Sequence, residues 1–332
     1  MAGDSFLATL PAPVAVAPRL SGELGGAARR PARDVLPLRV AVVIPTYLRE
    51  RILINTVRLV LSQNPPADEV LVIDQTPKHD ADTTAFLRGQ SRAGAIRWIR
   101  QHPPNLAAAR NRGLHETDCD IVLFLDDDVI PEPGLVEYHR LNYVSLSIDA
   151  VAGRIVGRGP HPPVPVTPRP NPHLEFRHFD FASTSRRECV AALHGANHSV
   201  RRASALALGG YDENYLRGFR EETDLALRLY RRGRVTVFDP RAAVIHLVAP
   251  SGGCRLSGFQ RSLQQWKVSF PAHYFAWKHL FPGISFWEEL AIDFRRAVLS
   301  RRNVLASYLL PAAMASFAFS LLYSCWRWQR SR

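Results

Sequence analysis

The chain has 332 residues, of which 46% are hydrophobic, and this size allows a substantial core in one large domain or two. Its formal net charge of +12 suits an anionic partner, whether a phosphorylated ligand, nucleic acid or an acidic membrane surface. The four cysteines contain no Cys-x-x-Cys pair, so neither a zinc ribbon nor a disulfide framework is indicated, and a reducing, cytosolic environment is the simplest inference.

Residues 1–37 are rich in Ala, Pro, Gly and Arg and lack the periodicity of a helix or a strand. We expect them to form a disordered leader. The apolar run Phe6–Val16 hints at a signal peptide, but no basic segment precedes it and Pro11 and Pro13 interrupt it, so we favour the leader. Ordered structure is expected from Leu38 onward.

From residue 38 to residue 125, short β-branched runs alternate with segments whose apolar residues have helical spacing. This pattern predicts strands at Val40–Ile44, Val70–Ile73, Ile96–Ile99 and Ile121–Leu125, and helices at Glu50–Ser62, Thr83–Ser91 and Leu106–His115. Strands that alternate with helices through short loops are typical of a parallel α/β sheet. Such sheets bind ligands beyond the carboxyl ends of their strands, where Thr46, Tyr47, Asp74 and the triplet Asp126–Asp128 fall.

Three adjacent carboxylates, Asp126, Asp127 and Asp128, follow the predicted strand Ile121–Leu125. They repel one another, and their position at the end of a buried strand is costly unless positive charge offsets them. Because side chains alternate in an extended chain, Asp126 and Asp128 should face one side and Asp127 the other. A divalent cation is the obvious partner, since it prefers hard oxygen ligands and can bridge to a phosphate. An ordinary acidic turn is the alternative that the triplet alone leaves open.

The loops that usually bind nucleotide phosphates are missing from the sequence. After the first predicted strand the chain reads Pro-Thr-Tyr-Leu-Arg-Glu, without the glycines of a G-x-G-x-x-G fingerprint. The lysine loop of P-loop enzymes and the Gly-rich loop of nucleotidyltransferases are also absent from the sequence. A nucleotide would therefore have to be held by side chains and a metal ion.

The motifs that occur in order along the chain are Val42–Tyr47, Val72–Asp74, Ala109–Gly113, Phe124–Asp128, Gly195–Asn197, Gly209–Asp212, Glu221–Leu225 and His246. This ordered set closely resembles family 2 glycosyltransferases of the GT-A fold, over roughly residues 38 to 255. The resemblance implies an α/β fold with a mostly parallel sheet flanked by helices. It also implies an inverting, metal-dependent transfer of a sugar from a nucleoside-diphosphate sugar to an acceptor hydroxyl. We therefore divide the chain into a leader (1–37), a GT-A domain (38–256) and a C-terminal helical region that associates with a membrane (257–332).

The resemblance also implies roles for individual residues. The donor-binding residues would be Thr46, Tyr47, Arg49, Asp74, Arg110, Asp126 and Asp127. Among them, Asp74 would accept hydrogen bonds from the base and Asp126 would face the ribose. Asp128 and His246 would bind Mg2+ or Mn2+ across the diphosphate. Without the resemblance, Arg110 would be interpreted as a surface arginine on an Ala-rich helix, and His246 as a packing or surface residue.

The acidic residues Glu221, Glu222 and Asp224 lie at the start of a helix predicted from about Thr223. Helix capping and the helix dipole also explain acids in a first turn. The family usually has Glu-Asp here, and its second acid is the catalytic base, so the resemblance points to Glu222, with Glu221 and Asp224 as the other candidates. The base would take the proton of the acceptor hydroxyl, while the metal offsets the charge on the departing diphosphate.

Beyond residue 131 the pattern predicts helices at Gly134–Tyr143 and Ala203–Leu208, and strands at Ala150–Val156, Val235–Phe238 and Ala243–Ile245. Between the strand predicted at Ala150–Val156 and the helix predicted at Ala203–Leu208, the segment Gly157–Arg187 is crowded with prolines from Pro160 to Pro172, which forbid regular structure. A loop of this length is either functional or disordered. We assign it to acceptor or membrane contact, with an inert insertion as the alternative.

The C-terminal region, residues 257–332, lies beyond the resemblance. Its segment Phe259–Lys278 is aromatic and basic, which is typical of a helix at a lipid interface. The stretch Val304–Trp326 has no charged residue and is long enough to cross a bilayer. Because it contains Pro311, a kinked span, a re-entrant segment and a buried core helix all remain open. We expect attachment to the cytoplasmic face of a membrane, and an acceptor that is a glycan or a lipid-linked molecule.

Two other functions compete with sugar transfer. A nucleotidyltransferase would also bind a nucleotide, but the missing Gly-rich loop argues against it. A non-catalytic membrane scaffold with a transferase-like domain is disfavoured because Asp126, Asp128, Glu222 and His246 are all present. Nucleic-acid binding is not expected, because the basic residues are spread along the chain and no recognition motif occurs.

Overall fold

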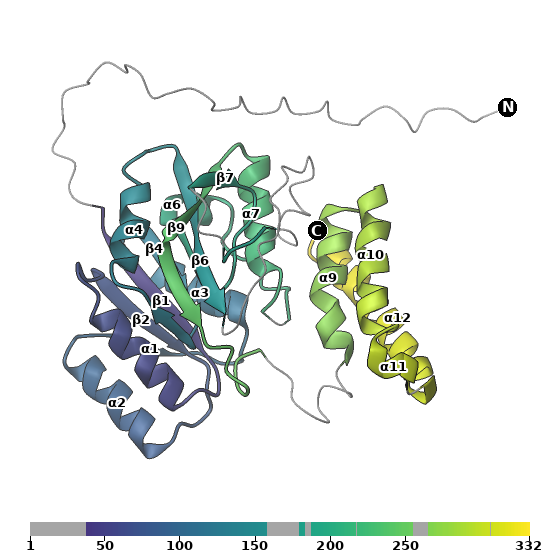
Figure 1. Ribbon diagram of the computed structural model, residues 1–332, viewed down its shortest axis with the longest axis horizontal. Helices are drawn as coiled ribbons and strands as arrows, with labels where there is room; N and C mark the ends of the chain where they lie inside the picture. Colours follow the sequence, from purple (N-terminus) through teal and green to yellow (C-terminus); the bar gives the residue numbers. More distant parts are fainter. Residues whose placement is uncertain (1–37, 158–178, 183–186, 217, 255–264, 306) are drawn as a thin grey trace, which may run out of the picture. The chain divides into compact units, whose positions relative to one another are not determined.

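The computed structural model describes residues 38–157, 179–182, 187–216, 218–254, 265–305 and 307–332. The predicted leader, residues 1–37, lies outside this described part, as do most of the Pro-rich segment and the first residues of the aromatic segment. Figure 1 shows a sheet flanked by helices, followed along the chain by a group of C-terminal helices.

A nine-stranded mixed sheet is the centre of the first part. Its strands are β1 (Val40–Thr46), β2 (Glu69–Asp74), β3 (Arg97–Arg100), β4 (Ile121–Leu125), β5 (Val129–Pro131), β6 (Ile148–Gly157), β7 (Glu188–Val190), β8 (Asn197–Arg201) and β9 (Val235–His246). They run in the order β3-β2-β1-β4-β8-β6-β9-β5, and β7 pairs with β9 outside this path. Strands β1 to β4 pair in parallel, as predicted, whereas β5, β7 and β8 add antiparallel pairs.

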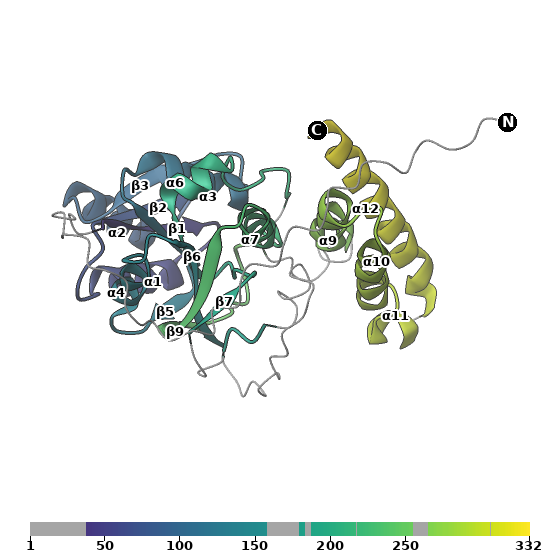
Figure 2. The same cartoon turned by 90° about the horizontal axis from the view of Figure 1, so that it is seen from above.

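The described helices that flank the sheet are α1 (Arg51–Leu61), α2 (Ala81–Arg92), α3 (Leu106–Glu116), α4 (Leu135–Asn142), α6 (Arg202–Ala207) and α7 (Glu221–Arg231). Figure 2 shows α3 and α6 on one face of the sheet and α1 and α4 on the opposite face. For α1 and α3 this follows from the strand order, because the chain moves outward from β1 to β3 and returns to β4 on the other side of β1. Right-handed crossovers in opposite directions put their helices on opposite faces.

The parallel pairing brings the carboxyl ends of β1, β2 and β4 to one edge of the sheet. Thr46 lies opposite Asp74, and Val43 lies opposite Phe124, two residues before the first carboxylate of the triplet. Both β1 and β4 are buried along their whole length, as their continuous apolar runs require. The predicted strand ends therefore meet where a ligand of an α/β sheet binds.

Strand β8 is buried although its sequence is largely polar, and it was not predicted. Polar side chains satisfy one another around it. His139 of α4 lies 2.9 Å from Asn197 through Nε2 and 2.8 Å from Ser199 through Nδ1, and His198 Nε2 lies 2.7 Å from the hydroxyl of Tyr211. Because hydrogen bonds compensate this burial, the strand needs no apolar alternation. The three-residue strands β5 and β7 were also missed.

Strand β9 corrects a further expectation, because the two strands predicted at Val235–Phe238 and Ala243–Ile245 are one continuous strand. It pairs in parallel with β6, and the register between the two shifts after Asp239. The next residue, Pro240, has no N–H group to donate, so the chain bulges here before the pairing resumes. The gap in the apolar pattern marks this bulge.

The C-terminal helices are α9 (Gln265–His279), α10 (Ile284–Ala297), α11 (Arg301–Leu305) and α12 (Leu310–Arg330), with a short 3-10 helix at Ser307–Leu309. Aromatic side chains of α9, among them Phe270, Tyr274 and Phe275, form a second core with Phe286 and Trp328. These α9 side chains are buried in protein, so the described part of the aromatic segment differs from the predicted lipid-facing helix.

One helix among the described residues, at Ser307–Arg330, is long and apolar enough to cross a membrane. Only 17% of its apolar window is buried within the protein. Of the three alternatives for this stretch, a buried core helix is therefore the least compatible with the structure.

Candidate functional site

The Asp triplet connects β4 directly to β5, and its side chains alternate as predicted. Asp127 is buried, and its carboxylate accepts hydrogen bonds from Thr46 Oγ1 at 2.7 Å and from Arg49 Nε at 3.2 Å. Asp126 and Asp128 instead approach His246. Asp127 is thus turned away from His246, whereas one carboxylate oxygen each of Asp126 and Asp128 lies near the imidazole.

Asp126, Asp128 and His246 form a cluster of potential metal ligands. His246 Nε2 lies 3.1 Å from Asp128 Oδ1 and 3.9 Å from Asp126 Oδ2. One ligand atom of each residue lies within 4.8 Å of the others. The pairing of β5 with β9 creates the cluster, because Val129 lies opposite His246. Asp128 and His246, which were predicted to bind the same ion, thus lie close together, and Asp126 lies beside them.

The three carboxylates differ in pKa. Burial raises the pKa of Asp127 to about 7. Burial also raises the pKa of Asp126, against the opposing charge of Arg110. Burial acts in the same direction on Asp128, but the hydrogen bond and charge of His246 outweigh it and lower the pKa of Asp128. Asp128 is therefore the carboxylate of the triplet that is most strongly held in its ionised, cation-binding form.

The segment after His246 folds back over the ends of the strands. The backbone N–H of Ala249 donates to Asp128 Oδ2 at 2.8 Å. Gly252 has a φ of +80°, and a Cβ at this position would lie 2.2 Å from the carbonyl oxygen of Leu48, so glycine is required. This loop thus ties the ends of β1, β4 and β9 together.

The residues predicted to line a nucleotide pocket after β1 lie in two different surroundings. Tyr47 is half-buried, whereas Thr46 and Arg49 are buried. Besides Asp127, the guanidinium of Arg49 binds Asp128 Oδ2 at 3.4 Å and the carbonyl of Ser251. Tyr47 therefore has a side chain open to a ligand, while Thr46 and Arg49 hold the acidic turn in place.

Asp74, predicted to accept hydrogen bonds from a base, is completely buried among protein groups. Its carboxylate lies within hydrogen-bond distance of the Thr76 N–H (2.8 Å), His79 Nε2 (3.0 Å), Trp98 Nε1 (2.9 Å) and Arg100 (2.9 Å). Burial would raise the pKa of Asp74, but these partners, His79 first, lower it. Contact between Asp74 and a base stays a prediction, and it would require one of these donors to give way.

Arg110 links the acidic turn after β4 to α7. Its guanidinium binds Glu221 Oε1 and the carbonyl of Gly195, the latter at 3.2 Å, and lies 3.9 Å from Asp126 Oδ1. The side chain is 1% exposed, which excludes the surface arginine that helix propensity alone suggested. Burial would lower the pKa of Arg110, but the adjacent charge of Glu221 raises it, so the cation is retained.

The acids in the first turn of α7 have contrasting surroundings. Glu221 is bound on both oxygens, by Arg110 and by the N–H of Phe219 at 2.5 Å. Glu222 Oε2 is buried and has no hydrogen-bond partner among the residues that the structure describes. Burial and the negative charge of Glu221 raise the pKa of Glu222 well above its ordinary value. Burial would also raise the pKa of Asp224, but a histidine and two cationic side chains lower it.

His194 lies near enough to His246 and Arg110 to be affected by their charges, although the sequence analysis did not single it out. Burial and the positive charges of His246 and Arg110 lower its pKa to about 4, so it is neutral at physiological pH. Its only signal is its place directly before the motif that starts at Gly195.

Three non-glycine residues in the described part, Leu48, Arg220 and Val248, have positive φ angles. Each is adjacent to or within two residues of a predicted site residue, at the ends of β1 and β9 and at the start of α7. For a β-branched residue such as Val248 this conformation is a true outlier. Backbone strain of this kind concentrates at functional sites, which supports the placement of the site here.

Residues 37–266 match the family described as glycosyltransferase like family 2. The chain is 26% identical over 216 residues to the probable glycosyltransferase YdaM of Bacillus subtilis (strain 168), a match that covers 61% of this chain and 49% of YdaM. It is 31% identical over 157 residues to the pre-mycofactocin glycosyltransferase of Mycobacterium tuberculosis (strain H37Rv), covering 44% of this chain and 30% of that protein. The chain thus spans half or less of the length of these curated relatives.

Two solved structures share the architecture. One is the crystal structure of GalNAc-T7 with UDP, GalNAc and Mn2+, with a TM-score of 0.54 and 16% identity over 78% of this chain and 57% of that chain. The other is the mannosyltransferase PcManGT from Pyrobaculum calidifontis in complex with GDP-Man and Mn2+, with a TM-score of 0.51 and 16% identity over 87% and 90% of the two chains. The predicted GT-A fold is confirmed.

Proposed function

Because this chain belongs to the glycosyltransferase-like family 2, we propose that it transfers a sugar from a nucleoside-diphosphate sugar to an acceptor hydroxyl, with inversion at the anomeric carbon. One observation carries the proposal: Arg110 joins a cluster of potential metal ligands to the acidic turn of α7, which bears Glu222. A displacement at the anomeric carbon needs positive charge near the leaving group and a base near the attacking hydroxyl. This arrangement offers both.

The ligand cluster suits a divalent cation. Asp126 and Asp128 supply carboxylate oxygens and His246 an imidazole nitrogen, all within reach of a single ion. Because Mg2+ favours oxygen ligands and Mn2+ also accepts imidazole, Mn2+ is the better match. Mn2+ also accompanies the nucleotide or nucleotide sugar in both similar structures. When bound, the ion would offset the negative charge that develops on the departing diphosphate.

Glu222 is the proposed general base. Glu221 is engaged on both oxygens, and Asp224 is held in ion pairs, so neither has an oxygen ready for a proton. Glu222 Oε2 has no such partner within the described ranges, and the raised pKa makes the Glu222 carboxylate a stronger base than an ordinary glutamate. The acceptor hydroxyl gives its proton to Glu222 as the acceptor oxygen bonds to the anomeric carbon. The bond from this carbon to the phosphate oxygen breaks on the opposite side, which inverts the centre.

The C-terminal helices are the proposed membrane attachment, on the cytoplasmic face, where a lipid-linked or membrane-proximal glycan would serve as acceptor. Support comes from large apolar side chains that are exposed on α10 to α12. They include Trp287, Leu305, Tyr308, Met314, Phe319, Leu322 and Trp326. Exposed apolar surface of this extent marks an interaction site, and the exposed Arg330 nearby suits acidic headgroups.

Donor binding can be tested by thermal shift on the full-length protein with UDP-GalNAc or GDP-mannose, with and without MnCl2. We expect one donor to raise the melting temperature only when Mn2+ is present, because a ligand that binds the folded state stabilises it by mass action. The variant Asp128→Ala should lose this shift, while Asp118→Ala, at a carboxylate with a 94% exposed side chain, should keep it.

Mass analysis of the products separates the alternatives. A sugar added to the acceptor, with release of nucleoside diphosphate, supports the proposal, whereas transfer of the nucleotide itself supports a nucleotidyltransferase. Absence of any donor-dependent shift, together with unchanged cellular glycans in Asp128→Ala, would indicate a scaffold.

Membrane attachment has its own test, flotation with vesicles of phosphatidylcholine and phosphatidylglycerol. The protein should float with the vesicles, and Leu322→Asp should weaken this binding because it puts a charge on the exposed apolar face. A wild-type protein that stays in the soluble fraction would contradict attachment.

A further inference from the structure

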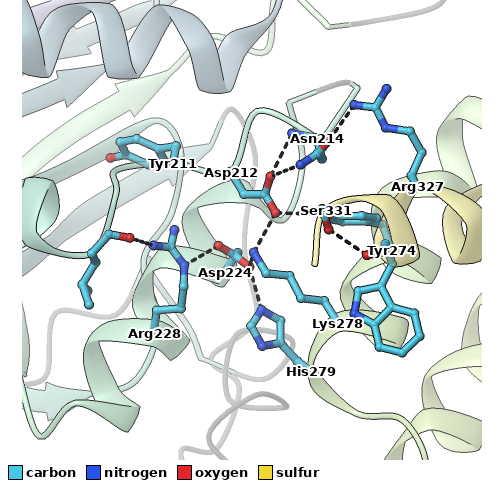
Figure 3. A network of polar contacts seen from close by, with 12 residues as sticks. Tyr211, Asp212, Asn214, Asp224, Arg228, Tyr274, Lys278, His279, Arg327 and Ser331 are labelled. Atoms are coloured by element: carbon cyan, nitrogen blue, oxygen red, sulfur yellow. Dashed lines mark hydrogen bonds and ion pairs between the residues drawn. The ribbon is translucent and has the colours of Figure 1, made fainter.

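The loop before α7 and α7 itself are both bound by the C-terminal helix α9 (Figure 3). Lys278 Nζ lies 2.7 Å from Asp212 Oδ2 and 2.7 Å from Asp224 Oδ1. His279 Nε2 lies 2.6 Å from the same oxygen of Asp224. The hydroxyl of Tyr274 donates to Asp212 Oδ2 at 3.0 Å. One lysine therefore joins the loop before α7 to α7 itself.

The residue directly before the acidic pair is also held by the C-terminal helices. Arg220 has a φ of +77°, a conformation that L side chains rarely adopt. Its NH2 group lies 2.6 Å from Glu289 Oε1 of α10, and its guanidinium lies over the ring of Phe275 of α9, 5.1 Å from the centroid. Both charged side chains are almost completely buried. Because Arg220 is bonded to Glu221, this ion pair fixes the backbone at the start of α7.

These ion pairs are not needed merely to hold the helices together. Leu227 of α7 and Tyr215 already share an apolar core with the aromatic side chains of α9 and α10. Buried ion pairs contribute little net stability compared with apolar groups of similar volume, whereas their geometry restricts orientation. The polar contacts are therefore placed to set the orientation of α7.

We propose that α9 and α10 are a positioning element for the proposed reaction, with Lys278 and Glu289 as positioning residues. They hold the first turn of α7 so that the Glu222 carboxylate faces the acceptor hydroxyl, and they do not touch substrate. The inference rests on the proposed role of Glu222 as the base. The match to the family ends at residue 266, so both positioning residues lie outside the matched region.

Hydrogen exchange tests, without any substrate, whether Lys278 and Glu289 hold the first turn of α7 in place. In the variants Lys278→Met and Glu289→Gln, we expect faster exchange in peptides that cover residues 219–226, and unchanged exchange in peptides that cover residues 121–130. Matched controls are Lys267→Met, the same change on the same helix, and Glu288→Gln, at the exposed neighbouring residue. Neither control should alter exchange in α7.

Kinetic measurements test whether this positioning of α7 supports turnover. With MnCl2 and whichever of UDP-GalNAc and GDP-mannose stabilises the wild type, we measure release of nucleoside diphosphate, with water in place of the acceptor. Misplacement of a catalytic group by about 1 Å lowers rates by about 100-fold, so kcat should fall by about 10- to 100-fold in Lys278→Met and Glu289→Gln. The KM for the donor should stay unchanged, because the potential metal ligands lie in the turn after β4 and at the end of β9. Lys278→Arg, which keeps the charge, should restore part of kcat.

Three results would overturn the inference. The first is unchanged exchange over residues 219–226. The second is faster exchange with wild-type kcat, and the third is a loss of kcat that only follows a parallel loss of melting temperature and donor affinity. Failure of the proposed function is seen separately, as a wild type that releases no nucleoside diphosphate from either donor, or as Glu222→Gln with wild-type turnover.

Discussion

The first turn of α7 contains two buried carboxylates, those of Glu222 and Asp224, whose pKa values are shifted in opposite directions. On the side toward Arg110, Glu222 has an oxygen without a hydrogen-bond partner in the described part of the chain, and its pKa is raised. On the side toward α9, Asp224 binds Arg228 Nε at 2.7 Å and Lys278 Nζ at 2.7 Å, and its pKa is lowered. The two acids are two residues apart.

The contrast shows that burial alone does not decide the protonation of an acid. Burial raises the pKa of both Glu222 and Asp224, and the number of cationic partners determines which way the balance falls. An acid with many partners is fixed in its ionised form and holds structure together. Glu222 has fewer such partners, because Arg110 pairs with the neighbouring Glu221. Glu222 is therefore able to exchange a proton.

The largest expected effect is on turnover in Glu222→Gln. The amide keeps the shape but cannot accept a proton, so kcat should fall by about 100- to 10,000-fold. Glu222→Asp should retain measurable activity, because a carboxylate remains. Release of nucleoside diphosphate gives the rates, and donor-induced thermal shifts show that binding is intact. Wild-type turnover in Glu222→Gln would remove the distinction between the two sides of the turn.

The next effect is on stability in Asp224→Asn. This change leaves Arg228 without its buried counter-charge and Lys278 with Asp212 alone, so the free energy of unfolding should fall by about 3 kcal/mol. Urea denaturation measures the loss, and Asp118→Asn is the control at an exposed carboxylate. A variant as stable as the wild type would mean that the ion pairs of Asp224 do not hold α7.

The sequence predicted the first half of the fold well because its strands are buried on both faces. The continuous apolar runs of β1 and β4 could be recognised without tertiary information. Strand β8 could not, because its burial is compensated by partners such as His139, which lies 58 residues away from Asn197 in the chain. Hydrogen bonds between distant residues leave no local pattern.

The same reason explains what could be predicted of the site. The Asp triplet and His246 were found because charge repulsion and motif order mark them locally. That Asp127 and Asp74 are occupied by protein donors, or that Lys278 reaches Asp224, depends on which segments meet in space. Residue type predicted where polar groups gather, and only the structure distinguishes those already paired from those left open.

The smallest expected effect has the opposite sign to that of Asp224→Asn. Because its pKa is raised on folding, Glu222 binds a proton more tightly in the folded state than in the unfolded chain, so this group costs stability as pH rises above its ordinary value of 4.5. Glu222→Gln does not ionise in either state and should therefore be more stable than the wild type by about 1 kcal/mol near neutral pH. The advantage should vanish below the ordinary value. Asp224 stabilises above its own ordinary value of 3.8, so the deficit of Asp224→Asn should shrink on acidification. Unfolding measured across this pH range should give curves that converge at acid pH, and parallel curves would contradict the opposite pKa shifts.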